Sequence, residues 1–121
     1  LRDPQRSVVC FAGDGCFMMY PQELATAAQF GATPVVIVVN NGMLGTIRMH
    51  QEREYPGRVS ATRLDNPDFV ALARAFGAHA ERVECSADFP AAFRRARESG
   101  RPALLELLTD PRQITPQARL A

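Results

Sequence analysis

The sequence predicts an α/β fold: a three-layer, doubly wound domain with helices on both faces of a mainly parallel sheet. Short apolar runs that end in glycine or asparagine alternate with segments of helical periodicity, and this alternation is typical of parallel strands joined by helical crossovers. The run over residues 35–39 is entirely β-branched, as in a strand buried on both faces. The length of 121 residues, with 46% hydrophobic and 22% charged residues, fits one compact domain.

Two strands and one helix are predicted in the first third of the chain. Residues 7–12 form a nearly continuous apolar run that ends in glycine, so we expect a strand buried on both faces. A helix is expected over residues 21–30, because Pro21 suits the first helical turn and Gly31 stops the helix. Residues 34–39 form the second predicted strand.

The middle of the chain carries weaker signals. Residues 43–52 are compatible with a short helix, and residues 54–65 with a loop. We expect Asn66 to cap a further helix that has Pro67 in its first position and stops at Gly77. Four residues at helical spacing form the apolar face of that helix: Phe69, Leu72, Ala73 and Phe76.

The last part of the chain predicts a strand, a helix and another strand. A partly polar strand is expected over residues 79–84. The helix that follows opens at Ser86 or Asp88 and ends at Gly100. Residues 102–108 form the fourth predicted strand.

The domain organisation follows from these elements. We expect residues 1–110 to form the domain and residues 111–121 to form a C-terminal tail or linker. The chain begins with Leu1 rather than methionine, and its first residues do not resemble a signal peptide. We therefore expect it to be a piece of a longer polypeptide.

Composition excludes several classes of function. The formal net charge is +1 and the chain has no basic stripe, so nucleic-acid binding is not predicted. No apolar stretch reaches the ~18 residues of a membrane span. The three cysteines lack metal-ligand spacing, and because Cys10 and Cys16 lie in apolar runs we expect buried free thiols and a cytoplasmic location.

Two polar motifs follow the first two predicted strands. Gly13-Asp14-Gly15 ends the first apolar run, Asn40-Asn41 ends the second, and residues 16–39 separate them. The carboxyl ends of parallel strands meet at one edge of a sheet, where α/β proteins bind ligands. A carboxylate, an amide oxygen and glycine backbone suit Mg²⁺ that carries a phosphate. Each motif alone is also an ordinary turn, but their joint placement favours a site.

The paired motif resembles the diphosphate-binding motif of thiamine diphosphate enzymes. Residues 22–27 and 40–46 look like the helix and the loop that follow the two halves of this motif in acetolactate synthase-like members. The resemblance covers roughly residues 7–106. It implies that thiamine diphosphate and Mg²⁺ are the cofactors.

The resemblance also implies a role for each site residue. Asp14 and Asn41 would bind Mg²⁺ through side-chain oxygens, and Met43 through its backbone carbonyl. Gly15 and Cys16 would donate backbone N–H groups to the diphosphate, and residues 44–46 would lie near the phosphate and thiazolium end of the cofactor. The implied cofactor-binding residues are Gly13, Asp14, Gly15, Cys16, Asn41, Met43, Leu44, Gly45 and Thr46. No catalytic residue is expected in this chain.

Two positions depart from the family, and two others allow alternative interpretations. Cys16 stands where serine is frequent, and a thiol is a weaker donor to phosphate. Leu44 stands where tyrosine is frequent. Glu23 is interpreted as a helix-start residue rather than as the glutamate that activates the cofactor. His50 is interpreted as a surface residue rather than as an acid–base group.

The resemblance implies the diphosphate-binding domain of an enzyme that acts on 2-oxo acids by decarboxylation or carboligation. The family's pyrimidine-binding domain comes from a second subunit, so a homodimer or tetramer is expected, and the isolated chain is expected to be inactive. The alternative is a non-catalytic α/β module that binds a nucleotide or a partner. A dinucleotide-binding module is disfavoured because residues 13–18 lack the third glycine of Gly-x-Gly-x-x-Gly.

Overall fold

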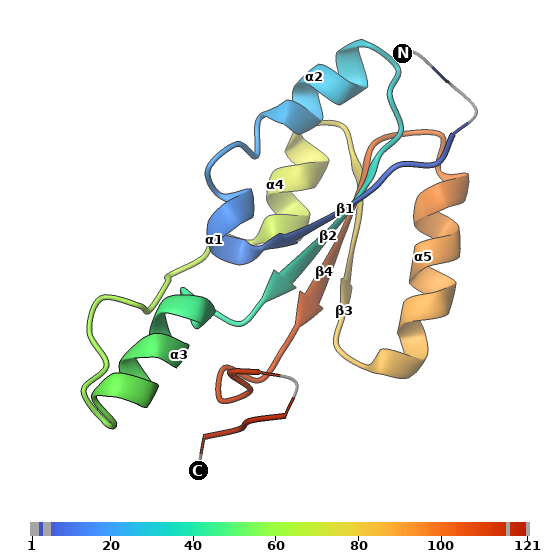
Figure 1. Cartoon of the computed structure of the whole chain (residues 1–121). Helices are drawn as coiled ribbons and strands as arrows, with labels where there is room; N and C mark the ends of the chain where they lie inside the picture. The colour runs from blue at the N-terminus through green and yellow to red at the C-terminus, as the bar shows by residue number, and fades with distance from the viewer. Residues whose placement is uncertain (1–2, 4–5, 116, 121) are drawn as a thin grey trace.

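A four-stranded sheet with parallel pairing throughout forms the centre of the molecule. The computed structural model describes residues 3, 6–115 and 117–120. The sheet has the order β1-β2-β4-β3 (Figure 1). Its strands are β1 (Val9–Gly13), β2 (Val35–Asn40), β3 (His79–Val83) and β4 (Ala103–Leu108), and all three pairings are parallel. The predicted α/β class with a parallel sheet is confirmed.

Helices cover both faces of this sheet and complete three layers (Figure 1). One face packs against α1 (Asp14–Phe17), α2 (Glu23–Gln29) and α4 (Phe69–Ala75). The other face packs against α5 (Phe89–Glu98), which follows a short 3₁₀ turn, η1 (Ser86–Asp88). Each interface has its own apolar cluster, the first including Phe17, Val38, Phe69 and Leu104, and the second Val35, Ile37, Ala96 and Leu105.

The register brings the two polar motifs to the same edge of the sheet. Gly13, the last residue of β1, is paired with Val39, and Asn40 of β2 is paired with Leu108. Helix α3 (Gly45–Glu54) follows β2 and extends away from this edge (Figure 1). The first site residues after β1 and β2 are therefore neighbours, as the parallel arrangement predicts.

The expectation that the first strand is buried on both faces is wrong. In the described chain β1 is an edge strand, and its Phe11 and Val9 side chains are 71% and 40% exposed. The reason is that β1 has a single strand neighbour, and α5 packs on β3 and β4 rather than over β1. The apolar run correctly marked a strand, but the sequence did not show which strand lies at the edge.

The cysteines were also predicted wrongly. Cys10, Cys16 and Cys85 are free but exposed, not buried. Cys10 lies on the edge strand, Cys16 on the short helix α1, and Cys85 between β3 and η1. An apolar sequence environment did not bury these side chains, because their elements lie at the rim of the sheet.

The helix after the central loop begins later than expected. Its N-cap is Asp68, whose carboxylate accepts a hydrogen bond from the Ala71 N–H at 2.9 Å, so Asn66 does not cap it and Pro67 precedes it. Aspartate is as good an N-cap as asparagine, and the Asn66 side chain bonds elsewhere. The short helix predicted over residues 43–52 is confirmed as α3, whereas α1 was not predicted. Within the described part of the chain, no helix is both long and apolar enough to span a bilayer.

Candidate functional site

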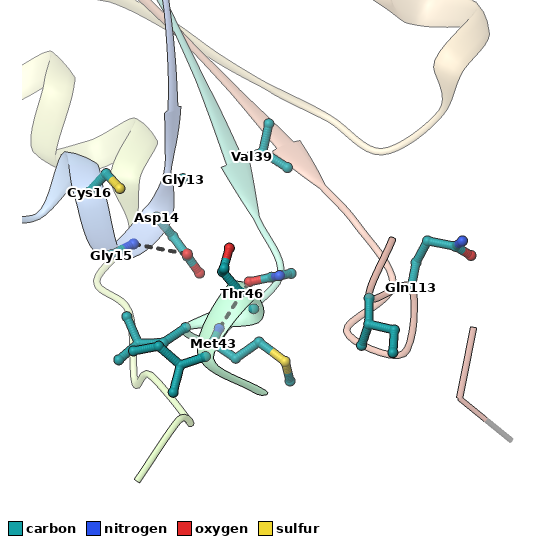
Figure 2. A pocket seen from close by; sticks show the side chains of 13 residues that line it. Gly13, Asp14, Gly15, Cys16, Val39, Met43, Thr46 and Gln113 are labelled. Atoms are coloured by element: carbon teal, nitrogen blue, oxygen red, sulfur yellow. Dashed lines mark hydrogen bonds between the residues drawn. The ribbon is translucent and has the colours of Figure 1, made fainter. Parts of the chain in front are cut away.

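A pocket of about 380 Å³ opens at the carboxyl-terminal edge of β1 and β2. All nine residues that the sequence predicted as cofactor-binding line it: Gly13, Asp14, Gly15, Cys16, Asn41, Met43, Leu44, Gly45 and Thr46. Figure 2 shows Asp14, Met43 and Thr46 gathered around it. Four further residues that the sequence had not singled out complete the lining: Val39, Ile47, Gln113 and Ile114.

Asp14 is the buried acid of the pocket, with an exposed fraction of 2%. It follows β1 directly and opens α1, so the strand end fixes its position. Its Oδ1 accepts a hydrogen bond from the Gly15 N–H at 2.9 Å. Its Oδ2 accepts two, from the Gly42 N–H and from Asn66 Nδ2, both at 2.8 Å. These three donors offset the cost of burying the carboxylate.

Glycines allow the loop after β2 to hold Asn41. The Oδ1 atom of Asn41 accepts a hydrogen bond from the Met43 N–H at 3.1 Å, which makes a local turn. Gly42 lies between them with φ of +67°, a left-handed conformation that favours glycine. A Cβ atom at Gly45 would stand 2.7 Å from Asn41 Nδ2, so only glycine leaves room for the amide in this position.

Helix α3 begins at the pocket with its amino terminus free of a side-chain cap. Its N-cap residue is Leu44, whose side chain makes no capping hydrogen bond. The first N–H groups of a helix have no partner within the helix, and together with the helix dipole they attract anions. Leu44, Gly45, Thr46 and Ile47 line the pocket at this helix end. This end of α3 can therefore receive a phosphate group.

The charge around the pocket is unusual for a phosphate site. Among the lining residues, all of which the structure describes, Asp14 is the one acid, and lysine, arginine and histidine are absent. Arg48 lies one turn into α3, where it contacts Met43 Sδ at 3.5 Å and Glu52 at 3.5 Å. A phosphate beside the Asp14 carboxylate would therefore need a bound cation between the two negative charges.

The donor set fits Mg²⁺ better than a softer metal. The described residues contain no group of three or more histidine, cysteine, aspartate or glutamate side chains that could hold a metal. Mg²⁺ needs few protein ligands, since phosphate oxygens and water complete its octahedron. Asp14 Oδ1 and Asn41 Oδ1 each accept one described hydrogen bond, and oxygens of these types accept more than one. Both keep the capacity to bind a cation.

Asn66 is a polar residue beside Asp14 whose contact with the site the sequence reasoning missed. Its Nδ2 donates to Asp14 Oδ2 and, at 3.0 Å, to Asn40 Oδ1. The asparagine before a proline favoured a helix cap, and that local signal concealed the long-range contact. By contrast, Glu23 and His50 do not line the pocket; Glu23 is in the first turn of α2 and His50 lies within α3.

Comparison with known proteins identifies the family of this chain. Residues 1–107 match the family model of the thiamine pyrophosphate enzymes, C-terminal thiamine pyrophosphate (thiamine diphosphate)-binding domain. The chain is 40% identical over 111 residues to the acetolactate synthase large subunit of Corynebacterium glutamicum, a match covering 87% of this chain and 18% of that protein. It is 38% identical over 108 residues to the acetolactate synthase isozyme 2 large subunit of Escherichia coli strain K12, covering 88% and 20%.

Solved structures share the fold. The thiamine diphosphate-dependent 4-hydroxybenzoylformate decarboxylase of Rhodococcus jostii RHA1 superposes with a TM-score of 0.82 at 31% identity, over 89% of this chain and 20% of that one. The benzoylformate decarboxylase of Polynucleobacter necessarius gives 0.80 at 25% identity, over 88% and 20%. The chain thus spans about a fifth of the length of these relatives. It belongs to the thiamine pyrophosphate enzymes, and what it contains is their C-terminal thiamine pyrophosphate-binding domain.

Proposed function

We propose that this chain is the diphosphate-binding part of a larger enzyme that uses thiamine diphosphate and Mg²⁺ to decarboxylate or join 2-oxo acids, as in the acetolactate synthase-like group. The observation that carries the proposal is the pocket itself. A helix amino terminus without a side-chain cap faces a buried aspartate, and the lining residues include no basic side chain. Mg²⁺ between a diphosphate and Asp14 satisfies all three features.

In this proposal each part of the pocket has one task. The Asp14 and Asn41 side chains and the Met43 carbonyl hold Mg²⁺. The N–H groups at the start of α3 and the backbone of Gly15 and Cys16 bind the diphosphate. When bound, thiamine diphosphate supplies the nucleophilic carbon for 2-oxo acid chemistry, and the protein supplies position and charge.

The proposal also explains why no acid–base residue was found in the pocket. Among the described lining residues, Asp14 is held by three donors and none is a histidine or a second carboxylate. We propose that the remaining groups come from a pyrimidine-binding domain on a second subunit, in a homodimer or tetramer. In this arrangement residues 1–110 form the binding domain, and the 111–121 tail contributes Gln113 and Ile114 to the pocket rim. Exposed free thiols persist in a reducing compartment, which supports a cytoplasmic location.

Calorimetric titration of the 121-residue chain with thiamine diphosphate tests the proposal. The titration is made once in the presence of Mg²⁺ and once with EDTA, which removes divalent cations. We expect weak binding that needs Mg²⁺, and no turnover of pyruvate. Asp14→Ala removes the one charged ligand, so binding should weaken at least about 100-fold. Asp65→Asn changes an exposed acid that pairs with Arg63 outside the pocket, and it should bind like wild type.

The outcomes separate the proposal from its alternative. Equal heats in wild type and Asp14→Ala would refute the metal assignment. A non-catalytic module that binds a nucleotide or a partner predicts no binding of thiamine diphosphate, with or without Mg²⁺. Turnover by the chain alone would contradict the half-site interpretation.

A further inference from the structure

Asp14 is the end of a chain of five hydrogen-bonded side chains that crosses the sheet. Asn66 Nδ2 donates to Asp14 Oδ2 at 2.8 Å and to Asn40 Oδ1 at 3.0 Å. Asn40 Nδ2 donates to Glu106 Oε1 at 2.7 Å. Arg82 Nε donates to the other carboxylate oxygen of Glu106, Oε2, at 2.8 Å. The members come from α1, the loop before α4, and the strands β2, β4 and β3.

The polarity of every link in this chain is fixed by chemistry. A carboxylate only accepts hydrogen bonds, so the Asn40 amide must turn its nitrogen toward Glu106 and its oxygen toward Asn66. The same rule makes Asn66 present its nitrogen to Asp14. Glu106 itself is held by Arg82, and the hydrogen bond that Arg82 donates to the Glu106 carboxylate raises the pKa of Arg82, which keeps this end of the chain charged.

The consequence at Asp14 is an unequal pair of oxygens. Among the described residues, Oδ2 receives two donors, the Gly42 N–H and Asn66, whereas Oδ1 receives one, the Gly15 N–H. The carboxylate torsion of aspartate is broad, so these donors decide how the group is turned. Without Asn66 each oxygen would keep one backbone N–H donor, and the carboxylate would be held less firmly in its present orientation.

The cost of this arrangement argues against a purely structural role. Glu106 is 1% exposed and interrupts the apolar strand Ala103–Leu108, with leucine on either side of it. Apolar residues of similar volume often replace a buried ion pair with no loss of stability. The described chain instead places the Glu106 charge and the Asn40 amide in the sheet, and the Asn66 amide connects them to the acid of the pocket.

We propose that Asn66 is a positioning residue for Asp14, oriented through Asn40 and Glu106, and that it presents Asp14 Oδ1 to the divalent cation. The identity of the cation rests on the proposed function, whereas the ordering of Asp14 rests on the contacts above. Loss of an outer partner of a metal ligand typically weakens metal affinity about 10- to 100-fold.

The test is the metal dependence of thiamine diphosphate binding in the 121-residue chain, with Mn²⁺ as the probe and bound Mn²⁺ measured by electron paramagnetic resonance. Asn66→Ala should raise the Mn²⁺ concentration for half-saturation about tenfold. Glu106→Gln keeps the shape of the side chain but allows it to donate, so the Asn40 amide nitrogen loses its carboxylate acceptor, and only the Gly42 N–H and Asn66 remain to orient the amide through its oxygen. It should raise the half-saturating concentration several-fold.

Matched controls separate positioning from general destabilisation. Asp65→Ala changes an exposed acid next to Asn66 in the same loop. Glu81→Gln removes a carboxylate of β3 that is paired with Arg95 of α5. Both controls should leave the half-saturating Mn²⁺ concentration unchanged. Thermal unfolding followed by circular dichroism gives the stability of each variant.

Two results would overturn the inference while leaving the proposed function intact. In the first, Asn66→Ala and Glu106→Gln are folded and have the half-saturating Mn²⁺ concentration of the wild type, whereas Asp14→Ala no longer depends on Mn²⁺. In the second, Mn²⁺ affinity falls in proportion to the loss of thermal stability, and it does so in the controls as well as in Asn66→Ala and Glu106→Gln. Metal dependence that survives in Asp14→Ala would instead refute the proposed function.

Discussion

Asp14 and Glu106 are both buried carboxylates on this domain, 2% and 1% exposed, but their negative charges are balanced in different ways. Glu106 is paired with the guanidinium of Arg82 at 2.8 Å. Asp14 accepts three hydrogen bonds from uncharged donors, and the structure describes no ion pair to it. The negative charge of Glu106 is therefore already neutralised within the fold, whereas that of Asp14 remains available to a bound cation.

The comparison explains why only one of the two acids is assigned to a metal. Both lie near the same sheet edge, and Asn40 and Asn66 connect them. An arginine beside Asp14 would compete with Mg²⁺ for its oxygens. Substitutions that remove the charge or the charged partner of one acid, and leave the other acid unchanged, test this difference.

The largest effect is expected when Asp14 is removed, as described above. Asp14→Ala should weaken Mg²⁺-dependent binding of thiamine diphosphate at least about 100-fold, whereas the loss of the Glu106 charge in Glu106→Gln should weaken it only several-fold. Titration calorimetry under identical Mg²⁺ concentrations compares the two variants. Equal losses would show that the two acids do not differ in function.

Arg82→Met tests the other acid through its partner. It leaves Glu106 buried without a cation, and we expect it to lower the free energy of unfolding by about 2 kcal/mol. This loss in the free energy of unfolding is smaller than the loss expected for breaking a fully buried ion pair, because the Arg82 side chain is 40% exposed. Urea unfolding gives the measurement.

The double variant Arg82→Met with Glu106→Met sharpens the result. It should recover most of the stability, because no buried charge remains. It should not recover the metal affinity, since the Asn40 amide nitrogen has lost the carboxylate that accepts its hydrogen bond. Recovery of both properties would contradict the connection between the two acids.

A smaller change is expected at Gly45. Its Cβ in Gly45→Ala would meet Asn41 Nδ2 at 2.7 Å, so the amide must shift away from its present place. We expect about a tenfold loss of Mg²⁺-dependent affinity with little loss of stability, because alanine favours a helix more than glycine does. Gly57→Ala has no such neighbour and serves as a control for binding, although its φ of +71° costs stability.

The smallest effect concerns a third carboxylate, Glu81, which is paired outside the pocket. Hydrogen bonds from Arg95 and His79 lower the pKa of Glu81 from its ordinary 4.5. The unfolded chain therefore binds more protons below about pH 4.5, and the stability that Glu81 contributes is present above that pH and is lost on further acidification. Glu81→Gln should be slightly less stable than wild type at pH 7, and this difference should vanish below the folded-state pKa. Urea unfolding at several pH values would show a constant difference if the pair contributed nothing.

Much of the site was predictable because it depends on local sequence and on parallel topology. The Gly13-Asp14-Gly15 and Asn40-Asn41 motifs end two apolar runs, and strands in a parallel sheet bring such ends together. The nine residues named from the motif all line one pocket. Their binding roles stay predictions until the titrations are made.

Other features depended on contacts between segments far apart in the chain. Asn66 looked like a helix cap until its bond to Asp14, 52 positions away in sequence, was seen. The apolar run of β1 could not reveal that this strand lies at the edge of the sheet, with Phe11 71% exposed. Gln113 and Ile114 lie in a segment with no motif, yet they line the pocket.

The sequence by itself determined the α/β class, the paired motif and the family, because hydrophobic periodicity and glycine-flanked polar residues are local properties of the chain. Only the tertiary structure decided which acid keeps an unpaired charge. Asp14 follows an apolar strand and Glu106 lies within one, but the residues next to each acid do not show how its charge is balanced. Strand order and register placed Arg82 beside Glu106 and gave Asp14 only uncharged donors, and this difference is what leaves Asp14 available to a cation.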